Sequence, residues 1–96
     1  MEETSSRECA LIAARAADER KATDIMVIKV GDLVDVTDYF VIATGANTPQ
    51  VEAILDNIEE KVRTEGGVKP ISREQTNDHS WELLDYGEFV VDVFQP

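Results

Sequence analysis

The chain has 96 residues, with 9 basic and 20 acidic side chains that give a formal net charge of −11 at pH 7. A chain of this length builds one domain around one core, and its charge repels nucleic-acid backbones and anionic membranes. A basic partner is therefore favoured, unless the charge only keeps a small protein soluble.

The single cysteine, Cys9, excludes an internal disulfide and a cysteine metal cluster, which favours the reducing cytoplasm. The first residues carry acids where a secretory signal needs a basic start, and no apolar stretch approaches the roughly 20 residues of a membrane span. We therefore expect neither a signal peptide nor a membrane-spanning segment.

The first predicted helix begins at Ser5, which with Glu8 forms a capping box, and runs to about Lys21. Residues 24–30, DIMVIKV, are apolar and β-branched at nearly every position, which predicts a strand covered on both faces or nearly so. The residues GDLVD that follow predict a loop. Residues 36–45 predict a second strand of the same kind, which ends at Gly45.

The clearest predicted element is a helix that starts with Thr48 as N-cap and Pro49 at the first helical position. The pair Gly66-Gly67 supplies a C-terminal stop. A single apolar stripe indicates that this helix lies on a sheet. The stripe consists of Val51, Ile54, Leu55, Ile58 and Val62.

Three further strands are predicted in the last third of the chain. Residues 68–72 predict an edge strand, since Pro70 cannot donate to a ladder, and residues 73–80 predict a polar loop. Residues 81–94, WELLDYGEFVVDVF, predict a hairpin with its turn at 85–88. The order α-β-β-α-β-β-β predicts an α/β (α+β) fold in which two helices cover one face of a mixed sheet of about five strands. The other face is then partly bare or covered by a partner.

Motifs for catalysis are weak. His79 lies in the polar loop without a second metal-ligating neighbour, and Cys9 lies among alanines, which indicates a small buried side chain. The segment ATGANT, 43–48, follows a strand and precedes a helix, but it lacks the spacing of phosphate-binding loops, so a simple turn is favoured. We predict no catalytic, cofactor-binding or metal-binding residues.

Three acids within or beside predicted strands are candidates for a functional site, because an acid among apolar strand residues needs a partner or solvent. They are Asp38, Asp85 and Asp92. Two carboxylates on adjacent strands could hold a divalent metal for nucleotidyl transfer. However, no predicted strand carries an Asp-x-Asp or Asp-x-Glu pair. Structural or partner-facing roles are favoured, and the alternative is a nucleotide-binding enzyme that uses Asp38, Gly45 and Asp92.

The segment TDYFVIATG, followed about 35 residues later by WELLDYGEFVVDVF, resembles the ribosome silencing factor family, also called the Iojap family. The resemblance covers about residues 10–94 and implies a fold similar to that of nucleotidyltransferases but without their catalytic residues. It implies a translational repressor that is not an enzyme. Such a repressor binds the large ribosomal subunit through its fourteenth protein and blocks joining of the small subunit when nutrients run short. Some family members serve instead in assembly of the large subunit.

The resemblance also implies a partner-binding site made of Trp81, Leu84, Asp85 and Tyr86, with Gly87 shaping the turn. Strand alternation places Trp81 and Asp85 on one face and Leu84 and Tyr86 on the other. The partner must then contact both faces around the edge or turn of the hairpin, or one of the two pairs does not belong to the partner-binding site. The fold is expected to use other apolar residues, namely Phe40, Val41, Ile42, Leu83, Phe89 and Val91.

The sequence departs from the family pattern at Asp92, where the family usually carries His, and at Lys29, where it usually carries Asp. The family normally continues past the final VF into a segment rich in Arg, Tyr and Leu, so we expect a single domain, 1–96, that lacks this segment. A further alternative is a dimerisation module whose bare sheet face is self-complementary. Core or homodimer-interface positions are expected at Phe89, Val90, Val91, Val93 and Phe94.

Overall fold

The computed structural model describes residues 5–31, 37–78 and 80–96. The predicted order of elements is confirmed. The elements are helix α1 (Ser6–Glu19), strands β1 (Thr23–Lys29) and β2 (Tyr39–Thr44), helix α2 (Thr48–Lys61), a π-helical turn η1 (Val62–Gly66), and strands β3 (Ser72–Gln75), β4 (Trp81–Asp85) and β5 (Phe89–Phe94). His79, Val36 and most of the predicted GDLVD loop lie outside the described residues.

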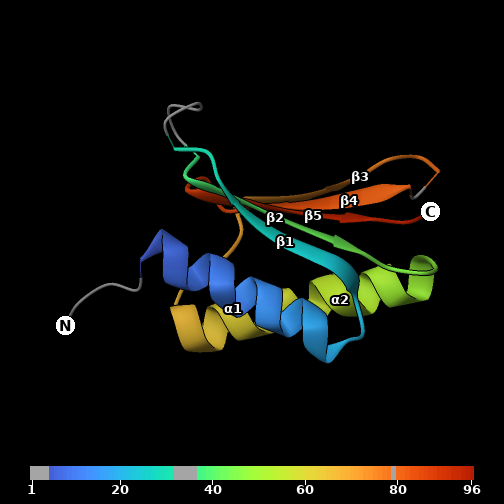
Figure 1. Ribbon diagram of the computed structural model, residues 1–96, viewed down its shortest axis with the longest axis horizontal. Coiled ribbons are helices and arrows are strands. Elements are labelled where there is room, and N and C mark those ends of the chain that lie inside the picture. Colours follow the sequence, from blue (N-terminus) through green and yellow to red (C-terminus); the bar gives the residue numbers. More distant parts are fainter. Residues whose placement is uncertain (1–4, 32–36, 79) are drawn as a thin grey trace.

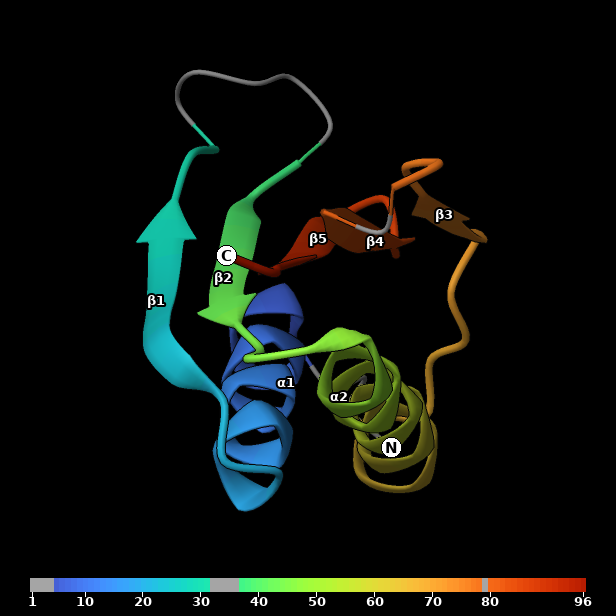
Figure 2. The same ribbon diagram turned by 90° about the vertical axis from the view of Figure 1, so that its right-hand side faces the viewer.

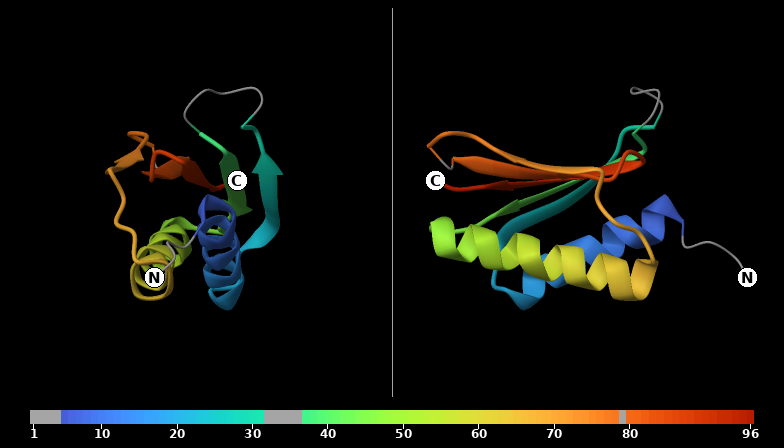
Figure 3. Two further views of the ribbon diagram at one scale, coloured as in Figure 1. Left: turned by 90° about the vertical axis from the view of Figure 1, so that its left-hand side faces the viewer. Right: turned by 180° about the vertical axis from the view of Figure 1, so that it is seen from behind.

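The five strands form one mixed sheet in the order β1-β2-β5-β4-β3. Only β2 and β5 are parallel, and the other three pairings are antiparallel. Both helices lie against one face of this sheet, and no described element lies over the other (Figures 1, 2 and 3). The predicted two-layer architecture is thereby confirmed. Neither helix in the described part of the chain has the length and apolar character needed to cross a membrane.

Both helices begin at a capping side chain. Ser5 Oγ accepts a hydrogen bond of 3.1 Å from the Glu8 amide, as predicted. In α2 the N-cap is Asn47 and not Thr48, because Asn47 Oδ1 accepts from the Gln50 amide at 2.9 Å. After η1 the chain leaves the helix at Gly67, whose φ of 71° is left-handed and favours glycine.

Two strand predictions are corrected. Strand β1 is not covered on both faces: it lies at the edge of the sheet, and Met26 is 53% exposed. The third strand lies at the opposite edge, as predicted, but comprises Ser72–Gln75, residues predicted mostly as loop. Pro70 comes before it, and the polar residues of β3 join the sheet by pairing with β4.

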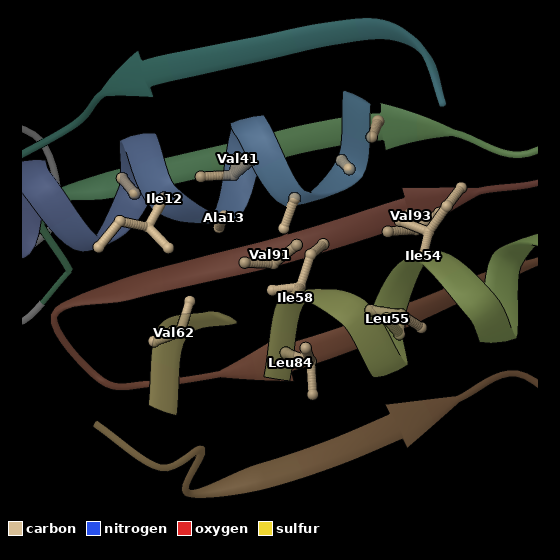
Figure 4. Close-up of a cluster of buried hydrophobic side chains, with 14 of the residues drawn as sticks. Ile12, Ala13, Val41, Ile54, Leu55, Ile58, Val62, Leu84, Val91 and Val93 are labelled. Atoms are coloured by element: carbon tan, nitrogen blue, oxygen red, sulfur yellow. The ribbon is translucent and has the colours of Figure 1, made fainter. Parts of the chain in front are cut away.

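The core lies between the helices and the sheet (Figure 4). Its largest fully buried side chains include those of Ile54, Leu55 and Ile58, which confirms the predicted stripe of α2. Helix α1 contributes mainly alanines and the buried Cys9, so its backbone approaches the neighbouring elements closely. A Cβ added at Gly66 would lie 2.9 Å from Cys9 Sγ, which shows how tightly η1 packs on α1.

Candidate partner-binding face

The strands bury one face of the sheet, and no described element covers the other. Val41, Leu84 and Val91 are fully buried and point toward the helices (Figure 4). Since successive side chains of a strand point to opposite faces, their neighbours in sequence point away from the helices. We call this second surface the open face. It comprises Met26, Ile28, Phe40, Ile42, Thr44, Ser72, Glu74, Trp81, Leu83, Asp85, Val90, Asp92 and Phe94.

The strand register arranges the open face in rows, because directly paired residues share a face. The middle row runs Glu74, Leu83, Asp92, Ile42 and Met26 across all five strands. A second row runs Ser72, Asp85, Val90, Phe40 and Ile28 on one side of it, and Trp81, Phe94 and Thr44 form a row on the other. The open face is therefore mainly apolar, with three acids.

Trp81 and Asp85 lie on the open face, at the two ends of β4, as alternation predicts. Trp81 pairs with Phe94, which is 41% exposed. Asp85 Oδ1 accepts a hydrogen bond of 2.8 Å from the Gly87 amide, and Gly87 has a left-handed φ of 83°. Asp85 and Gly87 thus fix the hairpin turn beside the open face.

Leu84 and Tyr86 lie on the helix side of the hairpin, where they offer almost no surface to a partner. Leu84 is fully buried, and the ring of Tyr86 stacks on Phe89 with centroids 4.4 Å apart. Burial also raises the pKa of the Tyr86 phenol, whose oxygen has no hydrogen-bond partner among the described residues. The expected roles of Leu83 and Leu84 are thus exchanged: Leu83 lies on the open face and Leu84 in the core.

Sequence reasoning missed the part of the open face contributed by the first two strands. Phe40 and Ile42 were expected in the core, but both point away from the helices and are half-buried, like Ile28 beside them. Strict alternation along β2 would have separated the two faces, because Val41 and Ala43 are fully buried and their neighbours Phe40 and Ile42 are not. The apolar surface is consequently broader than the hairpin alone suggests.

Arg73 ties α2 to the edge of the sheet on the helix side. Its guanidinium lies 2.7 Å from Glu52, 2.9 Å from Asp56 and 2.7 Å from Glu59, all on α2, and 3.8 Å from Glu82 on β4. Although partial burial opposes its charge, hydrogen bonds to Asp56 and Glu59 raise the pKa of Arg73. This Arg73 cluster explains why a polar segment joins the sheet as β3.

Glu82 is the buried member of the Arg73 cluster. It is 1% exposed, and its Oε2 atom has no hydrogen-bond partner among the described residues. Burial and the neighbouring Glu52 raise its pKa from 4.5 to about 7, against the attraction of Arg73. Glu82 is therefore protonated in much of the folded protein near neutral pH.

Glu82→Gln is expected to make the protein more stable at high pH. Below about pH 4.5 the carboxyl is protonated in both the folded and the unfolded state, and as the pH rises toward 7 the unfolded state releases its proton first. The parent therefore loses stability over this range, whereas the glutamine variant avoids the loss and should gain about 3 kcal/mol at high pH. Urea unfolding at about pH 5 and about pH 8 measures the difference. Glu74→Gln, at an exposed position, is the control, and an equal gain at both pH values would contradict the assignment.

The structure does not bring together Asp38, Gly45 and Asp92, the residues of the alternative nucleotide-binding site. Asp38 precedes the first residue of β2 and accepts a hydrogen bond from Ser6 Oγ at 3.1 Å, whereas Gly45 follows the last residue of β2. Seven residues of extended chain separate the two by on the order of 20 Å. Asp92 pairs with Ile42 between them and points to the open face. No group of three metal-ligating side chains occurs in the described ranges.

In the turn from β2 to α2, backbone amides donate hydrogen bonds to side chains of the same segment. The Ala46 amide donates to Gln50 Oε1 at 2.6 Å, and the Gln50 amide donates to Asn47 Oδ1. A hollow of about 550 Å³ elsewhere includes none of Asp38, Gly45 and Asp92. It is lined by Asp56, Glu59, Glu60, Arg63, Lys69 and Pro70. The site that the geometry favours is therefore the open face, which suits contact with a macromolecule.

Comparison with known proteins identifies the family of the chain. The model of the RsfS family, described as ribosomal silencing factor during starvation, matches residues 3–96. The chain is 36% identical over 83 residues to the ribosomal silencing factor RsfS of Bacillus subtilis, covering 86% of this chain and 70% of the relative. It is 37% identical over 102 residues to the chloroplastic protein Iojap of Zea mays, but spans only 42% of that relative's length.

Solved structures show the same fold. A crystal structure of a protein from Chromobacterium violaceum superposes with a TM-score of 0.87 at 28% identity, covering 96% of this chain and 76% of the other. A crystal structure from Bacillus halodurans gives a TM-score of 0.80 at 30% identity, covering 94% and 83%. The chain belongs to the ribosomal silencing factor (RsfS) family.

Proposed function

We propose that this protein represses translation under nutrient limitation by binding the large ribosomal subunit through its fourteenth protein, so that the small subunit cannot join. The observation that carries the proposal is the open face, a broad apolar and acidic surface that no described element covers, in a chain of a family described as silencing ribosomes during starvation. Trp81 and Asp85 make the contact directly. Leu84, Tyr86 and Gly87 support it by holding the hairpin from behind.

Steric exclusion of this kind needs a binding surface and a body bulky enough to clash, and it needs no chemistry. One buried tryptophan covers on the order of 200 Å², and tryptophan is enriched among the residues that dominate binding energy. A net charge of −11 also speeds the encounter with a basic protein. The protein therefore acts by occupying a surface, and the proposal includes no catalytic role and no cofactor.

The proposal places the protein in the cytoplasm. It also treats the free protein as a monomer at the open face, because this face carries Glu74, Asp85 and Asp92 and would oppose a second copy of itself. Light scattering of the free protein measures its mass in solution. We expect the mass of a single chain. The contrary result is a homodimer formed through this face, which would remain associated in high salt and dissociate when Phe94 is replaced by an acid.

Sedimentation with purified ribosomal subunits tests the proposed function. We expect the parent to sediment with large and not with small subunits, and to lower the yield of joined ribosomes when small subunits are added. Phe94→Glu replaces the exposed ring of Phe94 with a charged side chain and should weaken binding about tenfold, since an apolar contact is lost and the new carboxylate must be desolvated. Ala53→Glu adds the same charge at an exposed position of α2 and should bind like the parent. Failure of the parent to sediment with large subunits would overturn the proposal.

A further inference from the structure

One carboxylate lies in the middle of the open face with apolar side chains on every side. Asp92 pairs with Ile42 on β2 and with Leu83 on β4. Val90 and Phe94 lie before and after it on the same face of β5. The carboxylate of Asp92 is thus placed where water is partly displaced by four apolar neighbours.

Asp92 has no partner within the part of the chain that the structure describes. Its side chain is half-buried, and it makes neither a hydrogen bond nor an ion pair with any described residue. Desolvation by this burial raises the pKa of Asp92. A carboxylate in such a setting gains when a cation approaches it, because the cation replaces the water that has been lost.

The charges around Asp92 on the open face are all negative in the described strands. Glu74 lies in the same row on β3, and Asp85 lies in the next row on β4. The nearest basic residues of the sheet point to the helix side, since Lys29 pairs with Tyr39 and Arg73 pairs with Leu84. The open face therefore combines apolar contacts with charge of one sign, which selects the chemistry of its partner.

We propose that Asp92 receives a lysine or arginine side chain that the bound protein presents among apolar side chains of its own. This inference rests on the proposed function and adds the chemistry of the contact. A nucleic-acid phosphate in this position would be repelled, and a second copy of the chain would bring acids against acids. A basic protein surface satisfies both the apolar rows and the central carboxylate.

The proposal predicts opposite effects of Asp92→Asn on the free and the bound protein. In the free protein the substitution removes a charge that burial disfavours, so the midpoint of thermal unfolding should rise. In the complex it removes the acceptor of a charge-assisted contact, so binding should weaken about tenfold or more. If Asp92 served only the fold, Asp92→Asn would change the affinity for the partner no more than its effect on the stability of the free protein explains.

Binding to purified large subunits is the first arm of the test. The matched control is Asp18→Asn, which makes the same change of charge at an exposed position of α1 in the helix layer. We expect Asp18→Asn to bind like the parent, and Asp92→Asn to bind more weakly with a shallower dependence on salt. If the parent binds and Asp92→Asn binds equally well, this inference fails while the proposed function stands. If the parent does not bind, the proposed function fails, and the second arm decides the inference.

The second arm uses no ribosome. A soluble peptide of leucine and lysine is titrated into the protein, and the same peptide with glutamate in place of lysine serves for comparison, while backbone amide signals are followed by NMR. We expect the lysine peptide alone to shift the signals of Ile42, Leu83 and residue 92, and Asp92→Asn to lose most of this shift. Shifts confined to the helices, or shifts unchanged in Asp92→Asn, would overturn the inference.

Discussion

Arg73→Met is expected to lower the free energy of unfolding by about 3 kcal/mol. The guanidinium lies among four carboxylates, one of which, Glu82, is fully buried. Its removal leaves the three α2 carboxylates Glu52, Asp56 and Glu59 without their cation and raises the pKa of Glu82 further, and the cost of breaking such a buried pair is about 3–5 kcal/mol. We expect the lower end because Arg73 is 27% exposed and its contacts to Glu52 and Asp56 are screened by solvent.

Urea unfolding near neutral pH measures this loss, and Arg15→Met at an exposed position of α1 controls for the change of charge. The double variant Arg73→Met, Glu82→Gln should recover part of the stability, because the carboxyl that needs the cation is then absent. Equal effects of Arg73→Met with and without Glu82→Gln would show that the two side chains are not coupled.

Trp81→Ala is expected to weaken binding to the large ribosomal subunit at least about 30-fold, which corresponds to about 2 kcal/mol. Trp81 lies at one end of β4 on the open face, beside the exposed Phe94. Its indole would be desolvated fully only in the complex, so truncation removes interactions that the free protein does not make. Sedimentation across a range of protein concentrations measures the change in affinity.

Tyr86→Phe is the matched control for Trp81→Ala in the same hairpin. The phenol oxygen of Tyr86 is buried on the helix side without a hydrogen-bond partner among the described residues, so its removal should leave binding at the level of the parent. Circular dichroism of both variants checks that the fold is kept. Parent-like binding by Trp81→Ala, or weaker binding by Tyr86→Phe than by Trp81→Ala, would contradict the placement of the site on the open face.

The elements that could be predicted are those whose signals are local. Helix α2 was predicted nearly to the residue, because its apolar stripe, Pro49 and Gly67 act within the helix or at its ends. The hairpin was predicted because it alternates and turns at Gly87. The edge strand β3 was predicted at 68–72 and not at Ser72–Gln75, because its polar residues join the sheet through pairing with β4 and through the contact of Arg73 with α2.

The site could be predicted only in part, for a related reason. Strand β4 carries large apolar residues on both faces, so composition alone does not say which face meets the helices. Glu82 would ordinarily mark the solvent side, yet it is buried because Arg73 comes from another strand to meet it. The side of the hairpin that is free for a partner therefore depends on an ion pair between residues from different segments.

The parallel pairing of β2 with β5 also determines when the protein can fold. It joins Tyr39 to Phe89, so the centre of the sheet forms only after the residues through β5 have been synthesised. Before β5 arrives, β1 and β2 have no connection to β3 and β4, and the helices lack the side chains of Val91 and Val93 beneath them. Contacts so distant in sequence slow folding and leave apolar surface exposed meanwhile. The nascent chain therefore exposes apolar surface until β5 has left the ribosomal exit tunnel.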